Sequence, residues 1–172
     1  INFGIQDFFS YKAIQKKKIN KKIKIITALS MFYDLANPNK FLEDVKKVLD
    51  KEGIFITEDP YLLDVLEKVS YDQIYDEHVF IFSLTSIQKI CSKYDLEVFD
   101  VEKLNSAGGS MRYFISRKNS KKISKNVEEC LNKENKVDLF AEKTFLNFKN
   151  KCENSKKLLF DLLKDLSREK KI

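Results

Sequence analysis

An almost continuous apolar run near the start of the chain constrains the fold more than any other feature. The run extends from Ile23 to Ala28 and is interrupted by Lys24, a pattern typical of a strand that is buried on both faces. Such a strand needs neighbours in the sheet and helices above and below it. We therefore predict that these residues form a central strand of a parallel α/β sheet.

The following segment indicates a helix and then a second strand. Asn37 can cap a helix that has Pro38 at its first position, and apolar residues recur at helical spacing until an expected end near Gly53. Residues Gly53 to Glu58 have the pattern of the next strand. Ile23 to Glu58 is thus one strand, helix, strand unit of the kind that builds a parallel sheet.

Shorter helices are expected around this unit. The segment from Phe8 to Lys18 is predicted to be helical, and apolar stripes predict two further helices, over Tyr61 to Val69 and Thr85 to Tyr94. Either Ser83 or Thr85 can cap the last of these, because both are residue types that accept a hydrogen bond from a free backbone N–H.

A hairpin and a helical segment complete the pattern. Leu96 to Leu104 and Met111 to Ser116 flank Gly108-Gly109, as expected of antiparallel strands. After Asn119 the sequence becomes lysine-rich and helical, so we divide the chain into 1–118 and 119–172. The late helical segment carries an apolar stripe expected to pack on another domain, formed by Phe145, Phe148, Cys152, Ser155, Leu159, Leu162 and Leu166.

Length and composition limit the class of protein. The 172 residues, 43% of them hydrophobic, can bury one sizeable core. No apolar run approaches the roughly 18 residues of a membrane span, and the start lacks an export signal. The cysteines Cys91, Cys130 and Cys152 are widely spaced, without a C-x-x-C pair. We expect a cytoplasmic protein with reduced thiols, no membrane association and no metal site in this chain.

The net charge of +6 raises the question of nucleic-acid binding. Of the 32 basic residues only Arg112, Arg117 and Arg168 are arginine, although readout of phosphates and bases favours guanidinium groups. The lysines are also interspersed with acidic residues, which is typical of solvated faces. We therefore expect no nucleic-acid partner, and a basic interaction module is left as the alternative from another functional class.

The tetrad Tyr75-Asp76-Glu77-His78 contains the only histidine of the chain. An imidazole titrates near neutral pH, so a histidine beside a carboxylate can serve as a general base. A lone histidine is also commonly a packing or surface residue. The tetrad is therefore a candidate for proton chemistry that depends on its context.

That context is a resemblance over roughly Phe8 to Lys118. The chain resembles the S-adenosylmethionine-dependent sugar C-methyltransferases in several motifs that follow in the same order and spacing. These motifs are Ser30 to Leu35, Phe41 to Val45 with Val48-Leu49, Gly53 to Ile56, Pro60 to Leu62, Tyr71 to His78, Ser83-Leu84, Leu96 to Val101 and Gly108 to Arg112.

The resemblance implies a fold and an activity. The fold is α/β: the C-terminal part of a class I, Rossmann-like methyltransferase sheet that ends in an antiparallel hairpin and is followed by an α-helical segment. The activity is transfer of a methyl group from S-adenosylmethionine to a carbon of a nucleotide-linked ketosugar, a step of deoxysugar biosynthesis. The nucleotide sugar is the expected partner, and another small-molecule acceptor is the alternative within the same fold.

Catalytic roles follow from the resemblance by position. A sugar carbon becomes nucleophilic only after a proton beside the ketone is removed, so the reaction needs a base and a donor for the enolate oxygen. We expect His78 to be the base, Glu77 to orient the imidazole and Tyr75 to donate to the enolate. Asp34 and Asp76 stand where relatives commonly have histidine; Asp34 is an expected site residue past the first strand, with a turn role as the alternative.

The resemblance also implies residues that bind the cofactor and the substrate. A helix cap with core packing is the alternative for the cofactor residues, and a plain hairpin loop for the two glycines. The expected residues are Asp7, Phe8, Ala28 and Ser30 for the cofactor, and Tyr33, Tyr61, Gly108, Gly109 and Arg112 for the substrate.

Three parts of the family pattern are missing from these residues. They are the glycine-rich cofactor turn, the N-terminal cysteine-rich zinc module and the C-terminal nucleotide-fold domain. The first residue is Ile1 rather than methionine. We expect a fragment that is inactive in isolation, with zinc only in the missing N-terminal module.

Overall fold

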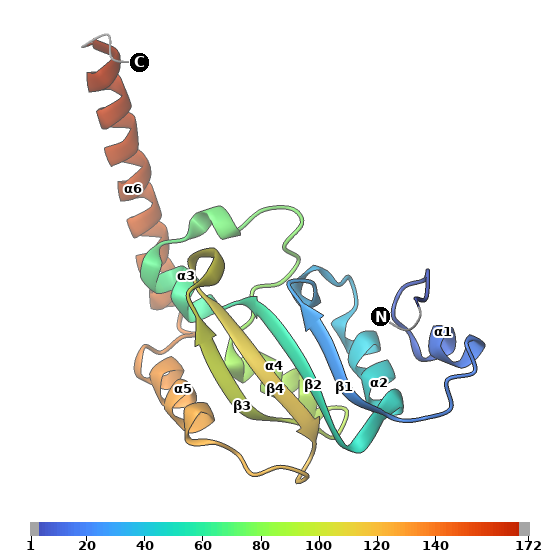
Figure 1. The fold of residues 1–172 in the computed structure, drawn as a ribbon. Helices are drawn as coiled ribbons and strands as arrows, with labels where there is room; N and C mark the ends of the chain where they lie inside the picture. Colours follow the sequence, from blue (N-terminus) through green and yellow to red (C-terminus); the bar gives the residue numbers. More distant parts are fainter. Residues whose placement is uncertain (1–3, 169–172) are drawn as a thin grey trace.

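Four strands form one mixed sheet in the order β1-β2-β4-β3 (Figure 1). The computed structural model describes residues 4–168. Strand β1 is parallel to β2, and β4 is antiparallel to both β2 and β3. The strands are β1 (Ile23–Leu29), β2 (Leu49–Pro60), β3 (Leu96–Leu104) and β4 (Ser110–Arg117). The predicted α/β class and the antiparallel hairpin are therefore confirmed.

The predicted crossover helix between the parallel strands is α2 (Pro38–Val48). Its cap is Asn37, whose side chain accepts the backbone N–H of Lys40 at 2.9 Å. The prediction that this helix ends near Gly53 is wrong, because Gly53 lies inside β2. A Cβ atom at Gly53 would come within 2.8 Å of the backbone oxygen of Ile23, so the glycine permits the close approach of the two strands.

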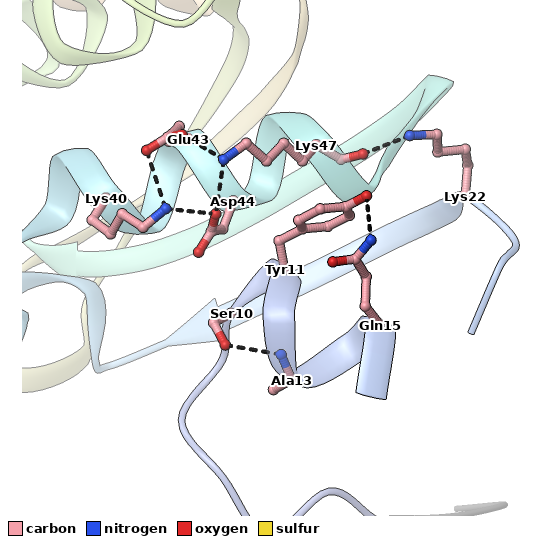
Figure 2. Close-up of polar contacts among 9 residues, drawn as sticks. All are labelled: Ser10, Tyr11, Ala13, Gln15, Lys22, Lys40, Glu43, Asp44 and Lys47. Carbon is pink, nitrogen blue, oxygen red and sulfur yellow. Dashed lines mark hydrogen bonds and ion pairs between the residues drawn. The ribbon is translucent and has the colours of Figure 1, made fainter. Parts of the chain in front are cut away.

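The remaining helices differ from the predictions mainly at their ends. The predicted helix from Phe8 to Lys18 is shorter, since the Ser10 side chain caps it by accepting the N–H of Ala13 at 3.1 Å (Figure 2). Ser83, rather than Thr85, caps α4 in a capping box with Ser86. The helices are α1 (Tyr11–Lys16), α3 (Leu62–Lys68), α4 (Leu84–Ser92), α5 (Lys125–Lys136) and α6 (Glu142–Arg168).

Lysines on the solvent side of α2 are paired with acidic residues (Figure 2). Lys40 contacts Glu43 at 3.1 Å and Asp44 at 3.0 Å, and Lys47 also pairs with both carboxylates. Lys22 reaches across from the start of β1 and donates to the carbonyl of Lys47 at 2.6 Å. The pairs with Glu43 are exposed and contribute little to stability, whereas Asp44 is buried.

One hydrophobic core lies against one face of the sheet. Phe55, Val98 and Ile115 are fully buried there, together with apolar side chains of α2, α4 and α5. Within the described residues β1 is an end strand of the sheet, with Ile25 66% and Leu29 52% exposed. The prediction of a central strand buried on both faces is therefore wrong here, because the described helices cover one face only.

A buried carboxylate on α5 ties this helix to the sheet. Glu134 is 1% exposed and accepts the backbone N–H groups of Leu84 at 2.7 Å and Thr85 at 3.0 Å. It also accepts the hydroxyls of Thr85 at 2.5 Å and Tyr61 at 2.9 Å. The negative charge thus lies at the N-terminus of α4, where free N–H groups and the helix dipole stabilise it. Helix α5 thus packs into the same core as the helices that precede residue 118. The division of the chain after residue 118 remains a prediction.

The last helix, α6, extends away from the sheet (Figure 1). The predicted apolar stripe falls on this one helix, and several apolar side chains near its end are exposed, including Leu158 at 62% and Phe160 at 63%. Among residues 4–168, no helix combines the length and apolar character that crossing a membrane requires.

The Glu134 contacts predict a large loss of stability on truncation. Glu134→Ala leaves two helix N–H groups and a buried tyrosine hydroxyl without an acceptor, and we expect it to lower the free energy of unfolding by about 3 kcal/mol. Glu128→Ala, on the exposed face of the same helix, is the control and should change it by less than about 0.5 kcal/mol. Urea unfolding measures both, and equal losses would contradict the assignment.

Candidate active site

The candidate site lies where the parallel strands β1 and β2 end. The backbone N–H of Ser30, just after β1, donates to the carbonyl of Glu58 on β2 at 2.9 Å. Tyr33 follows in a short 3₁₀ helix (Phe32–Asp34), and its carbonyl accepts the N–H of Phe80 at 3.1 Å. This bond brings the loop that carries the tetrad to the carboxyl edge of the sheet, where open α/β sheets bind ligands.

The imidazole of His78 is half-buried and is held by one backbone hydrogen bond. Its Nδ1 lies 2.8 Å from the carbonyl oxygen of Gln73. Because a carbonyl can only accept, Nδ1 carries the proton, and Nε2 of the neutral ring keeps a free lone pair. The backbone N–H of His78 donates to the carbonyl of Tyr75 at 3.0 Å, which closes the turn around the ring.

Two tyrosine rings flank this imidazole. The Tyr33 ring is edge-on at a centroid distance of 4.6 Å, and the Tyr75 ring is tilted at 4.0 Å. Burial, the neighbouring carboxylate of Asp34 and then Tyr75 raise the pKa of Tyr33. The Tyr33 hydroxyl therefore stays protonated at neutral pH and can donate a hydrogen bond. Tyr33, which was predicted separately from the tetrad, thus lies beside Tyr75 and His78.

The acidic residues of the predicted site lie at its surface. Asp34, Asp76 and Glu77 are exposed. The hydrogen-bond partner of the imidazole is Gln73, whereas Glu77 makes no hydrogen bond or ion pair with it in the described part of the chain. The orienting role of Glu77 therefore stays a prediction, as does the role of Asp34 beyond its effect on Tyr33.

Sequence reasoning missed Asp59, at the end of β2. This carboxyl is 1% exposed, accepts the backbone N–H of Tyr33 at 3.3 Å and lies 2.7 Å from the hydroxyl of Thr57. Burial raises the pKa of Asp59 to about 7, against the lowering effect of these two hydrogen bonds. Strand alternation was the available signal, because Phe55, Thr57 and Asp59 occupy the same face and that face is the core.

Of the residues predicted to bind the cofactor, Ala28 and Ser30 lie at the end of β1. Ser30 is exposed at the end of β1 with a left-handed φ of 53°, and Ala28 is buried in the strand. Asp7 accepts the N–H of Phe8 at 2.9 Å, and the Phe8 ring is 91% exposed. An aromatic series connects this segment to the loop after β1, through Phe9, Phe41 and Phe32 with centroid distances of 4.7 and 5.8 Å.

The residues predicted to bind substrate, Tyr33 apart, make contacts within the fold. Tyr61 is 2% exposed and lines a cavity of about 520 Å³ with Met111 and Cys130. The residues lining this cavity belong to α3, β3, β4 and α5, and His78 is not one of them. Arg112 pairs with Glu58 on β2 and Glu102 on β3, each at 2.8 Å, so it joins three strands across the open face.

The glycine pair has a structural explanation of its own. Gly108 and Gly109 have φ angles of 78° and 129°, a region that favours glycine. A Cβ on Gly109 would lie 2.2 Å from a carboxyl oxygen of Asp64 and 2.7 Å from Nζ of Lys68. Asp64 is fully buried and pairs with Lys68 at 2.8 Å and Lys103 at 2.6 Å. The pair of glycines therefore lets the hairpin loop pack on this ion cluster.

No metal centre accompanies these residues. Within the described range 4–168, no group of three or more His, Cys, Asp or Glu side chains is arranged to hold a metal ion. The polar groups that face one another at this edge are the imidazole of His78 and the neighbouring Tyr33 and Tyr75.

Comparison with known proteins identifies the family of the chain. The model of a methyltransferase domain family matches residues 2–101, and the model of a C-methyltransferase C-terminal domain matches residues 105–172. C-methyltransferase NovU of Streptomyces niveus is 29% identical over 93 residues, which are 54% of this chain and 22% of that protein. The chain thus spans about a fifth of the length of this relative.

Two of the solved structures to which the chain is similar are methyltransferases. One is an S-adenosylmethionine-dependent methyltransferase from Clostridium acetobutylicum, with a TM-score of 0.46 and 16% identity over 59% of this chain and 61% of the other. Another is magnesium protoporphyrin IX methyltransferase from Synechocystis with bound SAH, with a TM-score of 0.43 and 12% identity over 58% of this chain and 47% of the other.

The packing around Gly109 predicts that it cannot be replaced. Gly109→Ala forces a methyl group into the Asp64–Lys68 pair and strains the backbone, so it should lower the free energy of unfolding by at least about 2 kcal/mol. Gly4→Ala is the control, because no atom lies within 4 Å of the added carbon. Thermal and urea unfolding test both, and an alanine tolerated at 109 would contradict the described loop packing.

Proposed function

Because the chain belongs to the methyltransferase-domain family, we propose that the protein transfers a methyl group from S-adenosylmethionine to a carbon of a nucleotide-linked ketosugar. The observation that carries the proposal is the environment of His78: one ring nitrogen is bound to Gln73, and tyrosine rings lie on two sides. This arrangement suits removal of a proton from carbon. The match to a C-methyltransferase C-terminal domain supports carbon as the acceptor.

The residues at the edge of the sheet are compatible with the cofactor. Ser30 and Phe8 are exposed, and an open aromatic ring can stack on an adenine base. Asp7 and the backbone after Ala28 offer acceptors for hydroxyl or amino groups. We infer that these residues hold S-adenosylmethionine, which supplies an electrophilic methyl group when bound.

The protein's own residues then perform the proton chemistry. Nε2 of His78 takes the proton from the carbon beside the ketone, while Nδ1–H remains bound to Gln73. The electrons of that C–H bond move into the ketone, and the hydroxyl of Tyr75 donates to the oxygen as negative charge develops. Tyr33 keeps its proton because its pKa is raised by burial and by Asp34, so it offers a second donor to the substrate.

The acceptor is the least constrained part of this proposal. Arg112 is engaged by Glu58 and Glu102, and Tyr61 is buried against Glu134. Binding of a nucleotide sugar by either residue would therefore require these contacts to rearrange. A different small carbonyl acceptor is compatible with the same base, so acceptor identity is decided by the assay below.

Replacing His78 separates these possibilities. In the full-length protein with keto-deoxysugar nucleotides, His78→Gln should lower methyl transfer by about 10²–10⁴-fold, and deuterium wash-in at the sugar carbon should fall with it. Asp72→Asn, an exposed change in the same loop, is the control and should leave both rates unchanged. Wash-in that survives His78→Gln removes His78 as the base. No turnover of any ketosugar by the wild type points to another acceptor.

A further inference from the structure

The hydroxyl of Thr57 has two close acceptors but only one proton. Its Oγ1 lies 2.7 Å from a carboxyl oxygen of Asp59 and 3.0 Å from the backbone oxygen of Ala28. A hydroxyl donates one hydrogen bond, and a carbonyl oxygen donates none. If Asp59 were ionised, one of these two short contacts would bring two oxygen atoms together without a hydrogen atom between them. Such a contact between buried oxygen lone pairs is unfavourable.

A proton on Asp59 resolves this conflict. The carboxyl then donates from Oδ2 to Thr57, and Thr57 donates to Ala28 in turn. The other oxygen, Oδ1, remains free to accept the backbone N–H of Tyr33 at 3.3 Å. Every polar atom of the Asp59 side chain thus has a partner of the right kind.

The charged surroundings favour the same state. No ion pair within residues 4–168 involves Asp59; the neighbouring charges are the carboxylates of Asp34 and Glu58. Tyr113 faces Asp59 from β4, is fully buried and has its pKa raised first by burial and then by this carboxyl. Burial lifts the pKa of Asp59 to about 7.

We propose that Asp59 is a positioning residue that works as a neutral carboxylic acid and holds Tyr33 against the imidazole of His78. Thr57 connects it to β1, and Tyr33 connects it to the ring of His78 at 4.6 Å. The role of Asp59 in catalysis rests on the proposed function, whereas its hydrogen bonds to Thr57 and Tyr33 do not depend on that function. Asp59→Asn preserves this arrangement, because an amide can donate to Thr57 and accept from Tyr33, whereas Asp59→Ala removes both bonds.

The protonation state is tested directly in this 172-residue chain. With carbon-13 at the aspartate carboxyls, the Asp59 signal is the one missing from Asp59→Asn, and its titration should have a midpoint near 7. A midpoint close to the ordinary value of 3.8 would overturn the proposal, and so would an Asp59→Asn protein that does not fold.

The same state gives stability a defined pH dependence. Because the folded pKa of Asp59 is raised, its favourable contribution is complete below pH 3.8 and is lost as the pH rises through about 7. The thermal midpoint of the wild type should therefore fall relative to that of Asp59→Asn over this range. Parallel curves for the two proteins would contradict a buried neutral acid.

The positioning role is read at His78, the only histidine. Its Cε1–H proton signal should be unchanged in Asp59→Asn and displaced in Asp59→Ala. In the full-length enzyme, Asp59→Ala should lower kcat by about tenfold or more through misplacement of the base, and Asp59→Asn should restore it. A signal unmoved by Asp59→Ala overturns the positioning role. A Cγ midpoint near 7 with transfer intact in His78→Gln would instead refute only the proposed function.

Discussion

The hydrogen bonds of one buried carboxyl group connect the three backbone segments that form the candidate site. Asp59 ends β2, reaches β1 through Thr57 and the carbonyl of Ala28, and accepts the N–H of Tyr33 in the loop beyond β1. The carbonyl of Tyr33 then accepts the N–H of Phe80, at the end of the loop that carries His78. The position of the imidazole therefore depends on a chain of hydrogen bonds that begins inside the sheet.

A second buried carboxyl group, that of Glu134, is bonded in a different way. The carboxyl group of Glu134 accepts four hydrogen bonds and lies at the N-terminus of α4. Asp59 accepts one backbone N–H, from Tyr33, and its second oxygen meets a hydroxyl that has another acceptor, so the neutral form is the stable one. The two sites show why burial alone does not decide the charge of a carboxyl group; the donors around it do.

The sequence predicted the elements of the fold well, because local signals specify them. Asn37 and Ser83 cap helices, and the Gly108-Gly109 loop joins the hairpin, as their residue types indicate. It could not predict that β1 would be an end strand of the described sheet, since strand order depends on pairing between distant segments.

Among site residues, the tetrad was found because a lone histidine is conspicuous, whereas the contact of Tyr33 with His78 was not predicted. Asp59 was missed because its burial and its bond to Tyr33 join residues 26 positions apart. Glu77 was expected to orient the ring, but the partner of Nδ1 is the backbone carbonyl of Gln73. A hydrogen bond to a backbone carbonyl cannot be predicted from the types of side chain in the sequence.

The central claim is that the fold presents His78 as a base with Nε2 free. Nitrogen-15 NMR of the imidazole at mildly alkaline pH, where a histidine is neutral, tests this most directly, since a single histidine gives one unambiguous pair of signals. The structure predicts that the proton resides on Nδ1, bound to Gln73, and that Nε2 has the shift of an unprotonated nitrogen. A ring that carries its proton mainly on Nε2 would contradict the account.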